Sequence, residues 1–184
     1  LDTQLYINPI TYSVTDDDTR RLTKPDRAPG FALSFNSCRP YSAGSVYIKS
    51  ADAATPPAIH GNYLDDQRDI DDVLRMARFI GRMQNSPSVQ KLLAAPPETN
   101  LLALSDNEII DDFRTRSGTV FHPCGTCRMG PDRRHSVVDP QLRVHGVGKL
   151  RVADAAIFPN ITSANTNAPT IAVAHKAASL ILQR

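Results

Sequence analysis

Residues 121–130 read Phe-His-Pro-Cys-Gly-Thr-Cys-Arg-Met-Gly. Pro123 has a fixed φ angle and Gly125 tolerates φ values that other residues avoid, so the segment predicts a rigid, tight turn directly after His122. A histidine held at such a turn has a defined orientation, and histidine is the usual acid or base near neutral pH. On these residues alone His122 is a candidate catalytic base, but a single histidine is more often a structural hydrogen-bonding residue.

Two later segments combine polar and apolar residues in a similar way. Residues 150–159 read Leu-Arg-Val-Ala-Asp-Ala-Ala-Ile-Phe-Pro, and the apolar start predicts a buried strand over 150–154. Residues 165–170 read Asn-Thr-Asn-Ala-Pro-Thr and precede a run of small apolar residues that predicts a helix from Ala168. A helix start offers free N–H groups and a positive dipole end, which suit an electron-rich group. The alternative for Asn167 is a simple N-cap.

Together these segments resemble the C-terminal signature of the glucose–methanol–choline (GMC) family of FAD-dependent oxidoreductases. That signature reads His-Pro-x-Gly-Thr-x-x-Met-Gly, Val-Val-Asp-x-x-Leu-Arg-Val-x-Gly-Val, Leu-Arg-Val-Ala-Asp-Ala-Ser, and then a loop bearing Asn or His. The chain matches it at 122–130, 137–147, 150–155 and Asn165. The resemblance extends from about residue 40 to the end of the chain.

The resemblance implies an active site. His122 matches the base that takes the hydroxyl proton of a primary alcohol while a hydride passes to the flavin, which gives an aldehyde. Asn165 matches the second active-site residue, and an asparagine can hold the substrate oxygen but cannot titrate. Contacts with FAD are implied for Asp154, Ala155, Thr166, Asn167 and Pro169.

The fold class we expect is α+β, with an antiparallel sheet flanked by helices. The resemblance divides the chain into a substrate-binding portion over 1–147 and a strand and helix over 148–184 that complete the FAD-binding domain of a larger enzyme. Alternating or β-branched residues predict strands over 4–14, interrupted at Pro9, and over 31–36 and 45–50. We expect the last two strands to pair antiparallel.

Local signals predict the helices of the first portion. Apolar residues at helical spacing follow Asp65, and Ser86-Pro87 is typical of an N-cap and first-turn proline opening a helix through Leu93. Ser105 and Glu108 form a capping box, which predicts a third helix over about 106–117.

The sequence contains no Gly-x-Gly-x-x-Gly, so it lacks the segment that cradles the FAD pyrophosphate. The chain begins Leu-Asp-Thr-Gln, without a methionine or the pattern of a signal peptide. We therefore expect it to be a piece of a longer protein, with the N-terminal FAD-binding portion of the same enzyme as its partner. Alone, the chain should hold FAD poorly and show no turnover.

The composition of the chain disfavours several other classes of function. The 184 residues carry a net charge of +2, too close to neutral to favour a nucleic-acid partner, and no apolar run has the length of a membrane span. Three cysteines cannot form a complete disulfide framework, which favours the reducing cytoplasm. Two further hypotheses stay open: a hydroxynitrile-lyase-type member of the same family, and a binding module without catalysis.

Cysteine and histidine residues near the motif allow a metal or redox interpretation. Cys124 and Cys127 have the spacing of a redox pair or of half a zinc site, but no second pair exists and only Cys38 is left. We therefore expect both cysteines to pack around the His122 turn. His135 and His145 are expected to be solvated or structural, and no metal site is predicted.

Overall fold

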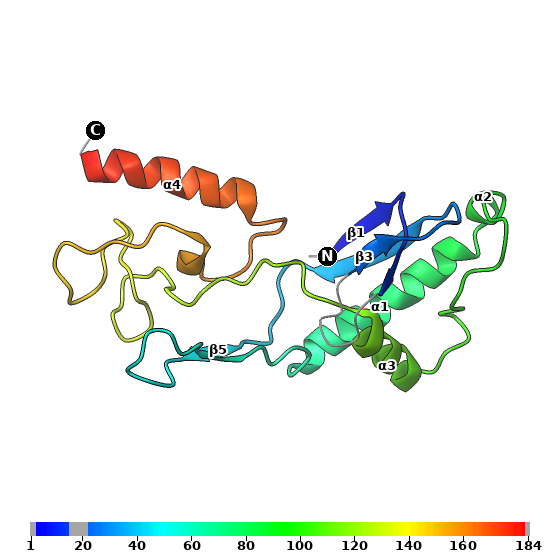
Figure 1. The fold of residues 1–184 in the computed structure, drawn as a ribbon, viewed down its shortest axis with the longest axis horizontal. Helices are drawn as coiled ribbons and strands as arrows, with labels where there is room; N and C mark the ends of the chain where they lie inside the picture. Colours follow the sequence, from blue (N-terminus) through cyan, green and yellow to red (C-terminus); the bar gives the residue numbers. More distant parts are fainter. Residues whose placement is uncertain (1–2, 15–21, 183–184) are drawn as a thin grey trace. The chain divides into compact units, whose positions relative to one another are not determined.

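The computed structural model describes residues 3–14 and 22–182, which fall into two compact units. Residues 3–37 and 66–118 form one, the strand–helix unit, and residues 38–65 with 119–182 form the other, the motif unit. Both mix short antiparallel strand pairs with helices (Figure 1). No helix in the described ranges is long and apolar enough to cross a bilayer.

Two strand pairs belong to the strand–helix unit. Its strands are β1 (Thr3–Asn8), β2 (Tyr12–Val14), β3 (Leu22–Pro25) and β4 (Ala32–Ser37). β1 pairs antiparallel with β4, which places Leu5 opposite Phe35, and β2 pairs antiparallel with β3. The chain leaves β1 just before Pro9, which cannot donate to a strand ladder, so the predicted interruption is confirmed.

Three helices complete this unit, and each starts at a local signal. They are α1 (Gln67–Gln84), α2 (Pro87–Gln90) and α3 (Asp106–Arg116). Ser86 caps α2 with Pro87 in its first turn, and the predicted capping box of Ser105 and Glu108 is present at α3. α1 packs against β4 and α3, and Figure 1 shows it running beside the β1–β4 pair. The buried apolar side chains are those of Val73, Met76, Ala77, Ile80, Leu101, Ile109 and Ile110.

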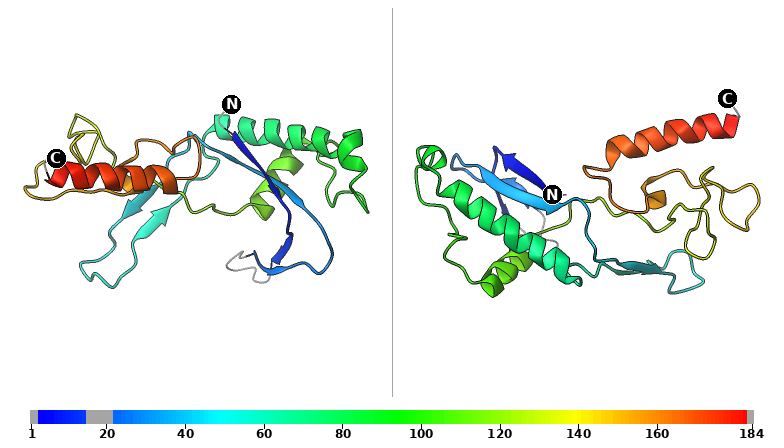
Figure 2. Two further views of the ribbon diagram at one scale, coloured as in Figure 1. Left: turned by 90° about the horizontal axis from the view of Figure 1, so that it is seen from above. Right: turned by 180° about the vertical axis from the view of Figure 1, so that it is seen from behind.

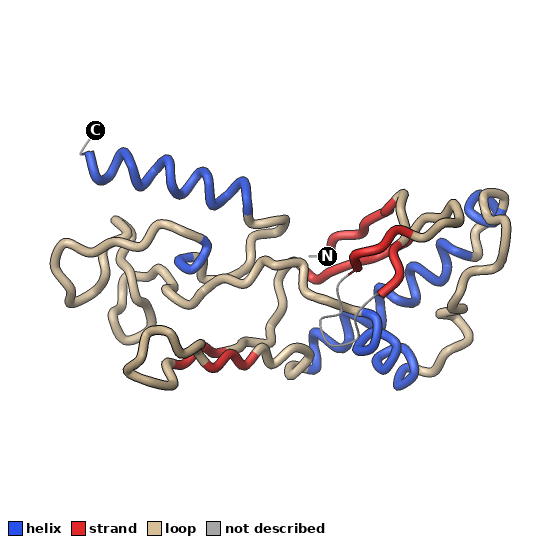
Figure 3. The backbone as a smooth tube through the Cα atoms, in the orientation of Figure 1, coloured by secondary structure: helices blue, strands red, loops and turns tan. Residues whose placement is uncertain are grey.

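The motif unit is mostly loop. Its elements are β5 (Ser45–Tyr47), β6 (Ala58–His60), the single-turn helix η1 (Ala155–Ile157) and α4 (Asn167–Leu182). Figure 3 shows that loops carry the chain between these elements. A core cluster of five buried residues holds the loops and α4 together: Val138, Leu142, Ile157, Phe158 and Ala177. The predicted helix after residue 168 is confirmed.

The predicted pairing between residues 31–36 and 45–50 is wrong, and so is the single antiparallel sheet. β4 pairs with β1, whereas β5 pairs with β6, visible as a separate two-stranded ribbon in Figure 2. Gly44 allows the close approach of the two segments, since a Cβ atom at this position would lie only 2.4 Å from the His60 carbonyl oxygen. The described residues therefore form three two-stranded antiparallel sheets.

The predicted buried strand over 150–154 is also wrong. Its only ladder contact among the described residues is one bridge between Arg151 and Arg143, and Leu150 is 49% exposed. A strand needs a neighbour along its length, and the segment passes at once into η1, which the Asp154 side chain caps. The side chains of Val152 and Ala153 instead pack against the core cluster.

Candidate active site

Left-handed backbone occurs on both sides of His122, but the turn itself lies at Thr126 and Cys127, a few residues later than the sequence predicts. Phe121 has a φ of 60° and Gly125 a φ of 90°, so both lie in the left-handed region. The Phe121 N–H donates a hydrogen bond of 3.0 Å to the Thr119 hydroxyl, which stabilises the entry to the turn. Only glycine occupies the left-handed region without a steric cost, and this explains Gly125.

Backbone hydrogen bonds fix the rest of the motif to η1. The Cys127 N–H donates to the Ala156 carbonyl at 2.9 Å, and the Met129 N–H donates to the Ile157 carbonyl at 2.8 Å. Ile157 is 1% exposed and belongs to the core cluster. The motif that carries His122 is therefore attached to the core cluster of its unit.

The structure brings His122 to the start of α4. The Oγ1 of Thr166 lies 3.1 Å from the Nδ1 of His122, although the two residues are 44 positions apart in the chain. His122 is half-buried, and Thr166 is only 7% exposed. Thr166 directly precedes the first residue of α4, so the contact unites the first and last segments of the sequence signature.

The other residues predicted from the last segment are close neighbours of Thr166 in the sequence. Asn165 is exposed and precedes Thr166, while Asn167 and Pro169 lie in the first turn of α4. That turn contains no acidic side chain. The positive end of the α4 dipole is therefore not offset by a carboxylate of its own first turn.

Asp154 and Ala155 have local structural contacts. The Asp154 carboxylate accepts a 2.7 Å hydrogen bond from the Ala156 N–H and so caps η1. Ala155 packs against the core cluster. In this chain both residues shape the turn that receives the His122 motif, and contact of either with FAD stays a prediction.

Cys124 packs against the core cluster, as expected for a structural residue. Burial raises the pKa of its thiol, and the charge of Arg128 opposes that rise. Cys124 and Cys127 are both free thiols, and no group of three potential metal ligands occurs within residues 3–14 and 22–182. The half-buried Cys124 thiol, with its raised pKa, is a weak nucleophile and a weak metal ligand at neutral pH.

His145 has structural contacts, one of the two settings expected for it. Its Nε2 lies 3.0 Å from the Gly130 carbonyl oxygen and 3.2 Å from the Ser136 hydroxyl, which itself donates to Gly130 at 2.9 Å. These contacts close the loop that follows the His122 motif. His135 is exposed and lies 3.0 Å from the Asp132 carboxylate, which confirms a solvated setting.

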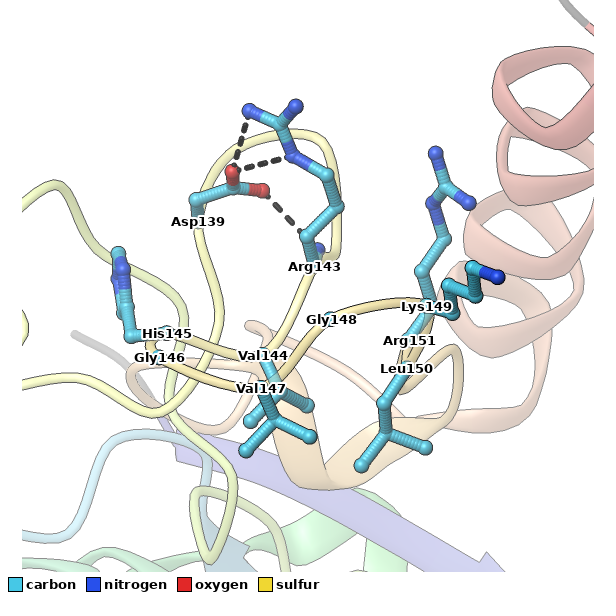
Figure 4. Close-up of a pocket in the computed structure, with 10 residues that line it drawn as sticks. All are labelled: Asp139, Arg143, Val144, His145, Gly146, Val147, Gly148, Lys149, Leu150 and Arg151. Carbon is cyan, nitrogen blue, oxygen red and sulfur yellow. Dashed lines mark hydrogen bonds and ion pairs between the residues drawn. The ribbon is translucent and has the colours of Figure 1, made fainter.

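A shallow pocket of about 310 Å³ lies on the loop from Asp139 to Arg151. Figure 4 shows the ion pair of Arg143 with Asp139 above the pocket, and the aliphatic side chains of Val144 and Val147 below it. Neither His122 nor Thr166 lines this pocket. The site suggested by the motif and the hollow in the surface are therefore different places in the motif unit.

Comparison with known proteins identifies the family. Residues 40–174 match the family profile described as GMC oxidoreductase. The chain belongs to the GMC oxidoreductase family. It corresponds to the C-terminal domain of these enzymes, which depend on FAD.

Individual GMC relatives agree with this assignment. The chain is 40% identical over 155 residues to an alcohol dehydrogenase [acceptor] from Pseudomonas putida, and 38% identical to an oxygen-dependent choline dehydrogenase from Klebsiella pneumoniae. Each match covers 84% of this chain but 28% of the relative. The crystal structure of pyridoxine 4-oxidase from Mesorbium loti superposes with a TM-score of 0.71 at 30% identity, over 88% of this chain and 32% of the other. The chain thus spans about a quarter to a third of the length of these GMC proteins.

Proposed function

We propose that this chain forms the C-terminal catalytic portion of an FAD-dependent oxidoreductase that acts on CH–OH donors and oxidises a primary alcohol to an aldehyde. The observation that carries the proposal is the 3.1 Å contact between Thr166 and His122. It joins the segment of the candidate base to the segment that holds Asn165, the candidate substrate-binding residue. Family membership supports the reaction class.

In this proposal His122 is the base. An alcohol becomes an aldehyde when its hydroxyl loses a proton and its carbinol carbon loses a hydride. The imidazole would take the proton, since histidine is the side chain most often used as a general base. Asn165, which does not titrate, would hold the substrate oxygen by hydrogen bonding.

FAD, when bound, supplies the hydride acceptor. The start of α4 fits this cofactor, because the first-turn N–H groups of a helix lack intrahelical partners and this turn has no carboxylate. Asn167 would present such an N–H group to an electron-rich ring edge, whereas Pro169 has none to offer. Residues 148–184, with α4, would complete the FAD-binding domain, and the absent glycine-rich segment would come from the N-terminal portion of the enzyme.

The proposal is tested in the FAD-containing enzyme that includes this chain. His122→Gln should lower the rate of flavin bleaching by the probe alcohols choline and 1-butanol by about 10²- to 10⁴-fold, the usual contribution of a general base. His135→Gln is the matched control, because His135 is exposed and contacts Asp132 instead of the site. If the flavin of the His122→Gln enzyme bleaches at the wild-type rate, His122 is not the base.

Product analysis separates the competing hypotheses. Aldehyde formed in step with flavin reduction supports alcohol oxidation. Cleavage of a cyanohydrin without net flavin reduction would point to a lyase instead, and the absence of any turnover in the intact protein would favour a binding module. For the 184-residue chain alone we expect weak FAD binding, which equilibrium dialysis measures directly. We also expect no turnover of the probe alcohols by this chain.

A further inference from the structure

Thr166 is an unusual residue to find enclosed. With Asp69, it is one of the buried polar residues in the part of the chain that the structure describes, and it is 7% exposed. A buried hydroxyl is costly unless it has a hydrogen-bond partner. Its partner here is the Nδ1 of His122, at 3.1 Å, within the ordinary range for such a bond.

The backbone of Thr166 is fixed from the helix side. Its carbonyl oxygen accepts hydrogen bonds from the Thr170 N–H at 3.0 Å and from the Thr170 hydroxyl at 2.6 Å. Threonine is also restricted at χ1 because two heavy atoms branch from its Cβ. The hydroxyl therefore sits at a place set by the start of α4, independently of the turn that carries His122.

We propose that Thr166 is a positioning residue for His122, and that its hydroxyl oxygen accepts the Nδ1–H of the imidazole. The inference rests on the proposed function of His122 as the base. A neutral imidazole has one N–H donor and one nitrogen acceptor. When Nδ1 carries the hydrogen and donates it to Thr166, Nε2 is left with the lone pair.

This tautomer is the one that can act as a base at Nε2. In the opposite arrangement the hydroxyl donates to Nδ1, the hydrogen lies on Nε2, and that nitrogen cannot accept a proton from an alcohol. With Thr166 as acceptor, the substrate O–H proton moves to Nε2, the imidazole becomes an imidazolium, and the Nδ1–H bond to Thr166 is kept. Thr166 thus acts through His122 and need not touch substrate or flavin.

Replacement of Thr166 by valine tests this directly, since valine has a similar shape but no acceptor. In the ¹⁵N-labelled 184-residue chain, nitrogen chemical shifts report which nitrogen of His122 carries the hydrogen. We expect the Nδ1–H tautomer in wild type and in Thr166→Ser, and a shift towards Nε2–H in Thr166→Val. Thr115→Val is the matched control, because it removes a helix hydroxyl that contacts the Asp111 carbonyl and not the imidazole.

Kinetics provide a second measure in the FAD-containing enzyme. One neutral hydrogen bond corresponds to about a five- to tenfold change in an equilibrium, so Thr166→Val should lower kcat for choline or 1-butanol by about that factor with little change in KM. Thr166→Ser should restore kcat to within about twofold. Thr166→Ala provides a smaller replacement for the same comparison if valine perturbs folding.

The outcomes separate this inference from the proposed function. An unchanged His122 tautomer in folded Thr166→Val or Thr166→Ala overturns the positioning role, even if His122→Gln is inactive. A shifted tautomer with the expected loss of kcat supports it. If His122→Gln keeps wild-type activity, the proposed function fails first, whatever the tautomer does.

Discussion

The carboxylate of Asp154 accepts a hydrogen bond of 2.7 Å from the backbone N–H of Ala156, and this contact caps η1. The carbonyl oxygen of Ala156 in turn accepts the N–H of Cys127 at 2.9 Å. The aspartate therefore shapes the turn to which the His122 motif is attached. This gives Asp154 a structural role in the chain that does not require a bound cofactor.

Substitution of Asp154 measures that role. Asp154→Ala removes the cap and should lower the free energy of unfolding of the chain by about 1 kcal/mol. Asp154→Asn should have little effect, because asparagine is an equally good N-cap. Urea unfolding followed by circular dichroism checks both values, and equal stability of the alanine and asparagine variants would contradict the capping role.

Gly125 is predicted to be the sensitive glycine of the motif. Its φ of 90° is costly for any residue with a Cβ, whereas the Cβ itself would lie 3.4 Å from the Phe158 carbonyl oxygen, an ordinary contact. Gly125→Ala should therefore lower the unfolding free energy by about 1–2 kcal/mol through the backbone alone. Gly148→Ala is the control, since a Cβ there meets nothing within 4 Å and its φ is not in the left-handed region. Equal losses in the two variants would argue against strain at Gly125.

The sequence predicted best what depends on neighbouring residues. Ser86 with Pro87 and Ser105 with Glu108 each start a helix where expected, because a cap is a contact across a few positions. Strand pairing is a contact between distant segments, and alternation alone does not identify the partner. This is why residues 31–36 were paired wrongly with residues 45–50.

The candidate site likewise combines residues that the sequence identifies with a long-range contact that it does not. His122 and Asn165 could be named because their segments resemble a family signature, whose residues can be matched one by one. The contact of His122 with Thr166 spans 44 positions, and no local pattern in either segment indicates it. The feature that marks Thr166 is its burial just before a helix, and burial cannot be predicted from the six residues of this segment.

Cys124 should react slowly with iodoacetamide. Burial raises the pKa of its thiol, so at a given pH less of the reactive thiolate is present than in the unfolded chain. Mass spectrometry after timed labelling should show slower modification of Cys124 in the native chain than in urea, at the same pH. If zinc blocks labelling of both Cys124 and Cys127 and a chelator restores it, the packing interpretation is wrong and a metal site exists.

The capping box of α3 should give the strand–helix unit a pH-dependent stability. The Glu108 carboxylate accepts 2.7 Å hydrogen bonds from the Ser105 hydroxyl and from the Ser105 N–H, and these bonds hold the pKa of Glu108 below its ordinary value of 4.5. A carboxyl with a depressed pKa stabilises the fold above its unfolded pKa, and that stability is lost as the pH falls through the folded pKa.

Wild type should therefore lose thermal stability between neutral pH and about pH 3. Glu108→Gln should lose less over the same interval, since its amide oxygen accepts the same bonds without titrating. The exposed Glu98→Gln is the control and should follow wild type. Melting followed by circular dichroism measures all three, and a Glu108→Gln curve that falls with pH as steeply as wild type would show that this carboxylate contributes nothing to the acid sensitivity of the unit.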